Sequence, residues 1–261
     1  MQSSGPSTRF GVEDEICEER RPMTLAIEEI RRKARYAGFL YLLLGLTAPI
    51  GLLYVPGKLF VPGDATTTAD NIRASGSLLR IGIASELFHQ IVGIFLVLAL
   101  FRLFRAVNER EATLMVVLSL TPVPIVMFNV LNEIAPLILV SGADFLSVYE
   151  KGQLDAMAFL FLRLHAQGID IASIFWGLWL FPFGMLVIRS GFIPRVLGIL
   201  MMIAGAGYLV SSNTTVLLPQ YTHQVGMVTM ILGLGELPIM FWLLIWGARE
   251  QSSRVPRLPD L

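Results

Sequence analysis

Long apolar stretches alternate with short polar ones along the chain, and this alternation predicts membrane-spanning helices. About 20 consecutive apolar residues cross the hydrocarbon core of a bilayer. Six segments reach that length, at residues 36–54, 79–101, 112–132, 169–188, 196–216 and 225–245. A further apolar stretch, residues 154–167, is shorter and is interrupted by Arg163 and His165. It is expected to form an interfacial helix that leads into the fourth span.

The composition supports this interpretation. Hydrophobic residues make up 54% of the 261 residues and charged residues 15%, whereas soluble domains are closer to a quarter charged. We therefore predict an all-α fold, a polytopic six-helix transmembrane bundle with short interfacial helices on the extracytoplasmic side. The bilayer is its expected partner. A formal net charge of zero gives none of the basic field that nucleic-acid binding requires.

The basic residues predict the orientation of these spans, because cytoplasmic loops carry an excess of Lys and Arg. Fifteen of the 20 basic residues lie on the face that holds both termini, and five lie on the other. Both termini are therefore expected in the cytoplasm, with the chain in a bacterial plasma (inner) membrane. Residues 1–22 are predicted to be a disordered cytoplasmic extension, 23–250 the membrane domain and 251–261 a cytoplasmic tail.

The start of the chain shows no signal peptide, because residues 1–22 lack an apolar core. Either Met1 or Met23 could be the true start, and Thr24 is a candidate helix cap. Cys17 is the only cysteine, so an internal disulfide and a zinc site built on several thiolates are both excluded.

The first outside loop, "YVPGKLFVPGDATTTADNIRAS", has the richest local pattern of any connection. Its two Pro-Gly pairs indicate turns. Asp64 and the threonines that follow it are expected to cap a short helix running through Asn71 and Arg73.

Three stretches together resemble a known family. They are "LFVPGDATTTADNIRASGSLLRIGI", "RLHAQG" and "RSGFIPRVLGILMMIAGAGYLVSS", and they are similar to the bacterial membrane-protein family catalogued as domain of unknown function 4386. The resemblance covers roughly residues 35–247. It implies an integral bacterial membrane protein, and it brings no established activity and no catalytic residue to transfer.

Polar residues inside the spans are the candidate functional groups, since ionisable side chains in lipid are expensive and tend to face the bundle interior. Residues spaced i, i+3 and i+4 share one face of a helix. The candidate polar intramembrane cluster comprises Glu86, His89, Gln90, Asn129, Asn132, Glu133, Asp170 and Glu236. These residues lie near the midplane or in the outer half, which predicts a polar vestibule open outward and closed inward.

We also predict which spans meet. The face of the second span that carries Glu86, His89 and Gly93 is expected to pack on the Gly233–Glu236 face of the sixth, because paired glycines allow close approach.

Three functions remain open from the residues alone. In the first, the polar side chains only form hydrogen bonds that hold the bundle together. In the second, the protein binds or transports a small molecule, and the prolines at 49, 122, 124, 182 and 238 break helices that line a cavity. A proton-coupled version of this alternative uses Glu236 or Glu86 as the titrating group. In the third, an intramembrane enzyme or redox protein holds zinc or haem on His89, His165 and His223.

No catalytic or nucleotide-binding motif is present in the sequence. Catalysis and a cofactor are therefore not expected, no soluble partner is indicated, and a homo-oligomer stays open.

Overall fold

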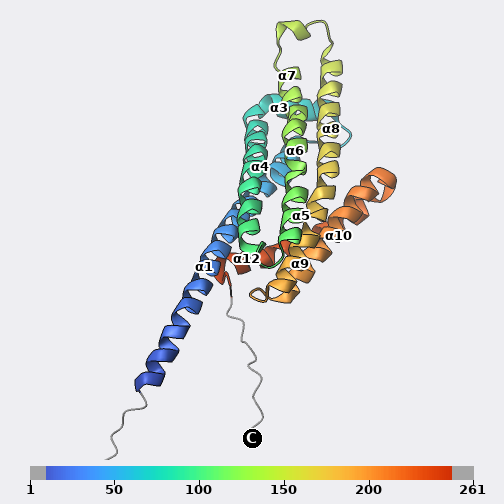
Figure 1. Cartoon of the computed structure of the whole chain (residues 1–261). Coiled ribbons are helices and arrows are strands. Elements are labelled where there is room, and N and C mark those ends of the chain that lie inside the picture. The colour runs from blue at the N-terminus through green and yellow to red at the C-terminus, as the bar shows by residue number, and fades with distance from the viewer. Residues whose placement is uncertain (1–9, 249–261) are drawn as a thin grey trace, which may run out of the picture.

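The computed structural model describes residues 10–248, with side chains described from residue 27 onward. Within that part, six helical segments are long and apolar enough to cross a membrane: Ile27–Leu59, Gly76–Phe104, Glu109–Leu139, Lys151–Ser190, Arg195–Leu217 and Pro219–Ile245. Each predicted span falls inside one of them. The prediction of an all-α, six-span protein is thus confirmed for the described residues (Figure 1).

Most spans consist of several shorter helices. The α-helices are α1 (Phe10–Pro49), α2 (Val55–Leu59), α3 (Ala65–Ala74), α4 (Gly76–Phe104), α5 (Glu109–Leu120), α6 (Pro122–Asn129), α7 (Leu131–Leu139), α8 (Lys151–Leu178), α9 (Leu180–Ser190), α10 (Arg195–Leu217), α11 (Thr222–Gly233) and α12 (Leu237–Ile245). The π-helix η1 (Ile50–Tyr54) follows α1, and the 3₁₀-helices η2 (Asp144–Leu146), η3 (Pro219–Tyr221) and η4 (Leu234–Glu236) complete the set.

Prolines account for most of these interruptions, as predicted, although Pro124 lies inside α6 and the break between α6 and α7 has no proline. A proline has no N–H to donate to the carbonyl four residues earlier, so the helical ladder weakens before it. Pro49 ends α1, Pro122 begins α6, Pro182 stands four residues after the end of α8, and Pro238 stands four residues after the start of η4. The first, third, fourth and sixth spans are therefore broken helices.

The N-terminal helix is longer than the sequence suggested. It begins at Phe10, so Thr24 lies inside α1 and does not cap its start. The predicted extension therefore divides: residues 10–22 belong to α1, and residues 1–9 lie outside the described residues. Residues 251–261, the predicted cytoplasmic tail, lie outside them as well.

The loop between the first two spans folds only in part as its sequence predicted. Pro62-Gly63 forms a turn, whereas Pro56-Gly57, also expected to form one, lies inside α2. The Asp64 side chain caps α3 by accepting a hydrogen bond of 2.9 Å from the backbone N–H of Thr67. Arg73 then pairs with the buried carboxylate of Asp155 on α8, and Lys151 Nζ lies 3.0 Å from the same carboxylate. These ion pairs fasten α3 to α8. Whether α3 lies at a membrane interface stays a prediction.

The separate interfacial helix expected at residues 154–167 does not exist. Those residues form the first half of α8, which runs unbroken from Lys151 to Leu178 after a capping box between Glu150 and Gln153. Arg163 and His165 do not break the helix, because their side chains lie on opposite faces of it. Arg163 is exposed, while His165 is buried between neighbouring helices.

Glycine contacts bring the fourth and fifth spans together. A Cβ built on Gly184 would stand 2.5 Å from the carbonyl oxygen of Gly198, and one on Gly177 would stand 2.7 Å from that of Gly205. Only glycine permits such backbone contact. In Figure 1, α10 lies along the ends of α8 and α9, whereas α4, the α5–α7 segment and α8 run side by side.

Candidate functional site

Most of the polar side chains that the sequence singled out within the spans fall into two groups. The first, which we call the outer triad, consists of Glu86 on α4, Glu133 on α7 and His165 on α8. The His165 Nε2 atom lies 3.3 Å from Glu86 Oε1, and its Nδ1 atom lies 3.9 Å from Glu133 Oε1. Their exposed fractions are 5%, 1% and 7%. Three separate helices therefore bring two carboxylates and an imidazole together in a site closed to solvent.

Asn129 holds the histidine helix in place. At the end of α6, its Nδ2 donates a 2.8 Å hydrogen bond to the backbone carbonyl of His165, while its Oδ1 accepts one of 3.0 Å from Asn132 Nδ2. This contact requires Gly168, because a Cβ there would stand 2.2 Å from Asn129 Oδ1. The polar face of the third span thus positions α8.

The two carboxylates are incompletely satisfied. Among the described residues, the Oε2 atoms of Glu86 and of Glu133 have no hydrogen-bond partner, although Glu86 Oε2 lies 3.3 Å from His165 Nε2 in an ion-pair contact. Buried polar atoms are almost always paired, and each one left alone costs roughly 1–3 kcal/mol. Two carboxylates so close together also repel each other when both are ionised. With both carboxylates ionised, the outer triad would therefore carry more negative charge than its single imidazole can balance.

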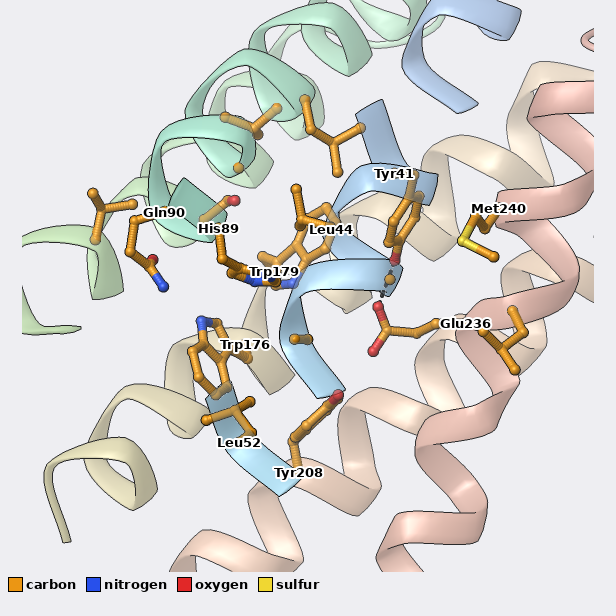
Figure 2. Close-up of a pocket in the computed structure, with 18 residues that line it drawn as sticks. Tyr41, Leu44, Leu52, His89, Gln90, Trp176, Trp179, Tyr208, Glu236 and Met240 are labelled. Carbon is orange, nitrogen blue, oxygen red and sulfur yellow. Dashed lines mark hydrogen bonds between the residues drawn. The ribbon is translucent and has the colours of Figure 1, made fainter. Parts of the chain in front are cut away.

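The second group surrounds what we call the inner cavity, a space of about 230 Å³. Glu236, on the short η4 that interrupts the sixth span, accepts a hydrogen bond from the Tyr41 hydroxyl of α1. Tyr208 of α10 also interacts with this carboxylate. Trp176 and Trp179 stand across the cavity from Glu236 (Figure 2).

His89 lines the opposite side of the inner cavity from Glu236 (Figure 2). Its Nδ1 lies 3.1 Å from the Thr47 hydroxyl, and Ser85 Oγ donates a 3.0 Å hydrogen bond to the Thr47 carbonyl. These bonds join α4 to the end of α1.

A second, smaller space of about 20 Å³ adjoins the inner cavity and has Glu86 in its wall. The two spaces share His89, Gln90 and Trp176 among their lining residues. The inner cavity therefore extends toward the outer triad along α4.

The predicted polar cluster is thus divided. Glu86 and Glu133 belong to the outer triad, with Asn129 and Asn132 beside it, and His89, Gln90 and Glu236 line the inner cavity. Asp170 belongs to neither group; its backbone carbonyl accepts hydrogen bonds from Ser212 (2.6 Å) and Ser173 (2.8 Å).

The three histidines suggested as metal ligands do not meet. His165 is in the outer triad, His89 faces the inner cavity, and His223 is exposed near the start of α11.

The predicted packing of the second span on the sixth is wrong. Helix α1 lies between them, packing against α4 on one side and α12 on the other. Glu86 meets His165 of the fourth span, and a Cβ added to Gly93 would touch nothing within 4 Å. Helical periodicity shows which face of a span is polar, and it does not show which neighbour that face meets.

Sequence reasoning missed the aromatic residues of the inner cavity, namely Tyr41, Tyr208, Trp176 and Trp179. A signal was present for the tyrosines. Tyr41 and Tyr208 lie well inside apolar spans, where a hydroxyl requires a hydrogen-bond partner, and Glu236 was an available acceptor.

Comparison with known proteins places the chain in a family. The family model described as "Domain of unknown function (DUF4386)" matches residues 36–247. An uncharacterized protein of the archaeon Archaeoglobus fulgidus is 37% identical over 81 residues, which are 31% of this chain and 47% of that protein. The matched region thus spans about half the length of this relative. No solved structure matches the chain. Because the family model covers most of the chain and nearly all six spans, this integral membrane protein belongs to the family of domain of unknown function 4386.

Proposed function

We propose that this protein binds a small molecule with an apolar body and a cationic nitrogen in the inner cavity. The observation that carries the proposal is the placement of Glu236. Its carboxylate, on an interrupted segment of the sixth span, faces a cavity whose other walls are mostly aromatic and aliphatic side chains, with His89, Gln90 and Ser119 as the other polar groups. An acidic group in an apolar cavity with a few converging polar groups is a usual form of ligand site.

The lining favours a cation. A carboxylate on one side and indole faces on the other attract a positively charged nitrogen from both directions. Tyr41 donates a hydrogen bond to the carboxylate and Tyr208 lines the cavity beside it, while Trp176 and Trp179 supply aromatic surface. The volume of about 230 Å³ lies just below the roughly 300–1,000 Å³ typical of drug-sized ligands. The ligand should therefore be small, of the size of an aryl amine.

A matched pair of probes tests this proposal. Phenethylamine and 2-phenylethanol have the same apolar body, and only the amine is cationic at neutral pH. We expect phenethylamine to cause a saturable change in tryptophan fluorescence of the detergent-purified protein, and the Glu236→Gln variant to bind it at least tenfold more weakly. The alcohol should bind weakly and equally to both proteins, which controls for partition into the detergent.

Equal binding of phenethylamine by wild type and Glu236→Gln would contradict the proposal, as would an affinity for the alcohol that matches the affinity for the amine. Circular dichroism and gel filtration show whether the variant is folded. Glutamine keeps the acceptor for Tyr41, so the variant should retain the wild-type fold.

Transport is a second candidate, favoured by the broken spans around the cavity. Transporters use interrupted helices to line a midplane site, and the first, fourth and sixth spans, which contribute Tyr41, Trp176 and Glu236, are all interrupted. We place the protein in the plasma membrane with both termini in the cytoplasm, on the strength of the basic residues. In this orientation the smaller space beside Glu86 would lie on the outer side of the inner cavity, and the apolar cluster around Leu100, Phe104 and Phe183 would lie on its cytoplasmic side.

A further inference from the structure

We propose that the outer triad, Glu86, Glu133 and His165, binds one divalent transition-metal ion of the zinc type. This site differs from the inner cavity and from the set of three histidines that the sequence suggested. It is built from one nitrogen donor and two carboxylate oxygens on three helices.

The geometry is close to that of a metal site. One ligand atom from each residue lies within 4.8 Å of the other two. Zinc bonds to nitrogen and oxygen of about 2.0–2.1 Å in tetrahedral geometry put the ligand atoms roughly 3.3 Å apart. The His165 and Glu86 atoms already have that separation, at 3.3 Å. The Glu133 carboxylate instead faces the other imidazole nitrogen, Nδ1, at 3.9 Å. A metal ion bound to Nε2 therefore requires the Glu133 side chain to rotate toward that nitrogen.

Charge provides an independent argument. Both carboxylates are buried, and the Oε2 atom of each has no hydrogen-bond partner among the described residues. Glu86 Oε2 has only the ion-pair contact of 3.3 Å with His165 Nε2. A divalent cation would bind both oxygens and balance two negative charges, while the imidazole stays neutral. The site would then carry no net charge, which a water-poor interior strongly favours.

The donor set indicates the class of metal. The absence of a thiolate disfavours Cu⁺, and the imidazole disfavours Mg²⁺ and Ca²⁺, which prefer oxygen ligands. Zn²⁺, Mn²⁺ and Fe²⁺ all accept one imidazole and two carboxylates. Three protein ligands leave a fourth position open. The space of about 20 Å³ beside Glu86 is large enough for one water molecule near that position.

The surrounding structure holds the ligands before any metal arrives. Asn129 and Gly168 lock the third span onto α8 next to His165. The rival explanation is a Glu–His–Glu hydrogen-bond cluster that shares protons and has no affinity for metal. The experiment must separate these two, because both predict a folded protein with a buried histidine.

Cobalt titration of the wild-type protein decides between them. The protein is purified in detergent without a polyhistidine tag, stripped with a chelator and titrated with Co²⁺, whose visible absorption reports coordination by protein ligands. We expect saturation at one ion per chain and displacement by an equimolar amount of Zn²⁺. A wild-type protein that shows no saturable Co²⁺ absorption would overturn the proposal, whatever the behaviour of the variants.

Single-residue variants test which side chains bind the metal ion. Glu133→Gln and His165→Gln should each weaken Co²⁺ binding at least 100-fold, whereas His223→Gln, far from the triad, should bind as wild type does. Zn²⁺ should raise the Tm of wild type and of His223→Gln and leave that of Glu133→Gln unchanged. If a triad variant does not fold, Glu86→Gln takes its place. Unchanged Co²⁺ binding in the triad variants, or its loss in His223→Gln, would refute the assignment.

Discussion

At the scale of single residues, the fit between Gly168 and Asn129 decides how the third and fourth spans meet. Asn129 Oδ1 occupies the space that a side chain at position 168 would need, and its amide bonds the carbonyl of His165. No other residue type at position 168 leaves this contact intact. The polarity of residue 129 is visible in the sequence, whereas the need for glycine at 168 becomes clear only once the two helices are side by side.

We predict that Gly168→Ala destabilises the protein by about 1–3 kcal/mol, the usual cost of overpacking a close contact. The measurement is thermal unfolding in detergent. Gly152→Ala, on the same helix, is the matched control, because a Cβ there meets nothing within 4 Å. Its Tm should be at or slightly above that of wild type, since alanine is the better helix former. Equal Tm values for both variants would show that the contact has no energetic weight.

Much of the candidate site could be predicted at this scale, and its partners could not. The cost of placing Glu86, Glu133 or Glu236 in lipid is several kcal/mol, so each had to face the interior. The choice of neighbour depends on the tilt and rotation of whole spans, which result from many small packing differences. The glycine contacts illustrate this: Gly93 and Gly233 were expected to meet, and the close pairs are Gly184 with Gly198 and Gly177 with Gly205.

At the scale of elements, α3 shows how far local signals reach. Its start follows from Asp64 and Thr67 alone, since a capping side chain satisfies the free N–H groups of the first turn. The α8 helix shows the limit of such signals. Arg163 and His165 suggested that a separate short helix ends near them, but α8 continues past both residues and His165 is buried.

We predict that the order of α3 depends on pH through its cap. Hydrogen bonds from Thr67 lower the pKa of Asp64. A lowered folded-state pKa adds stability that is complete above the unfolded-state pKa and is lost as the pH falls through the folded-state value. The α3 amides should therefore exchange hydrogen faster at acidic pH, after correction for the intrinsic rate.

Asp64→Asn is the control for this prediction, because asparagine caps equally well and does not ionise. If hydrogen exchange in the α3 amides of this variant still becomes faster at acidic pH, we assign that effect to Asp70. The pKa of Asp70 is lowered by hydrogen bonds from Lys151 and Arg73. Identical pH profiles for wild type and Asp64→Asn would exclude Asp64 as the source.

At the scale of the whole molecule, the number and positions of the spans were predictable because each span gains transfer free energy along its full length. Orientation rests on fifteen basic residues against five. The structure supplies exposed sites on the face predicted to be outside, at Thr67, Ser147 and Gln220.

We predict that single cysteines at these three sites, in a Cys17→Ser background, react with a membrane-impermeant maleimide added to intact cells. A cysteine at Glu109, an exposed residue on the opposite side, should react only after lysis. The reverse pattern would invert the orientation.

The backbone contact between α9 and α10 has a mechanical consequence. With each carbonyl 2.5 Å from where the other glycine would carry a Cβ, the two helices cannot slide past one another without first separating. Any conformational change should therefore carry α9 and α10 together as one rigid unit.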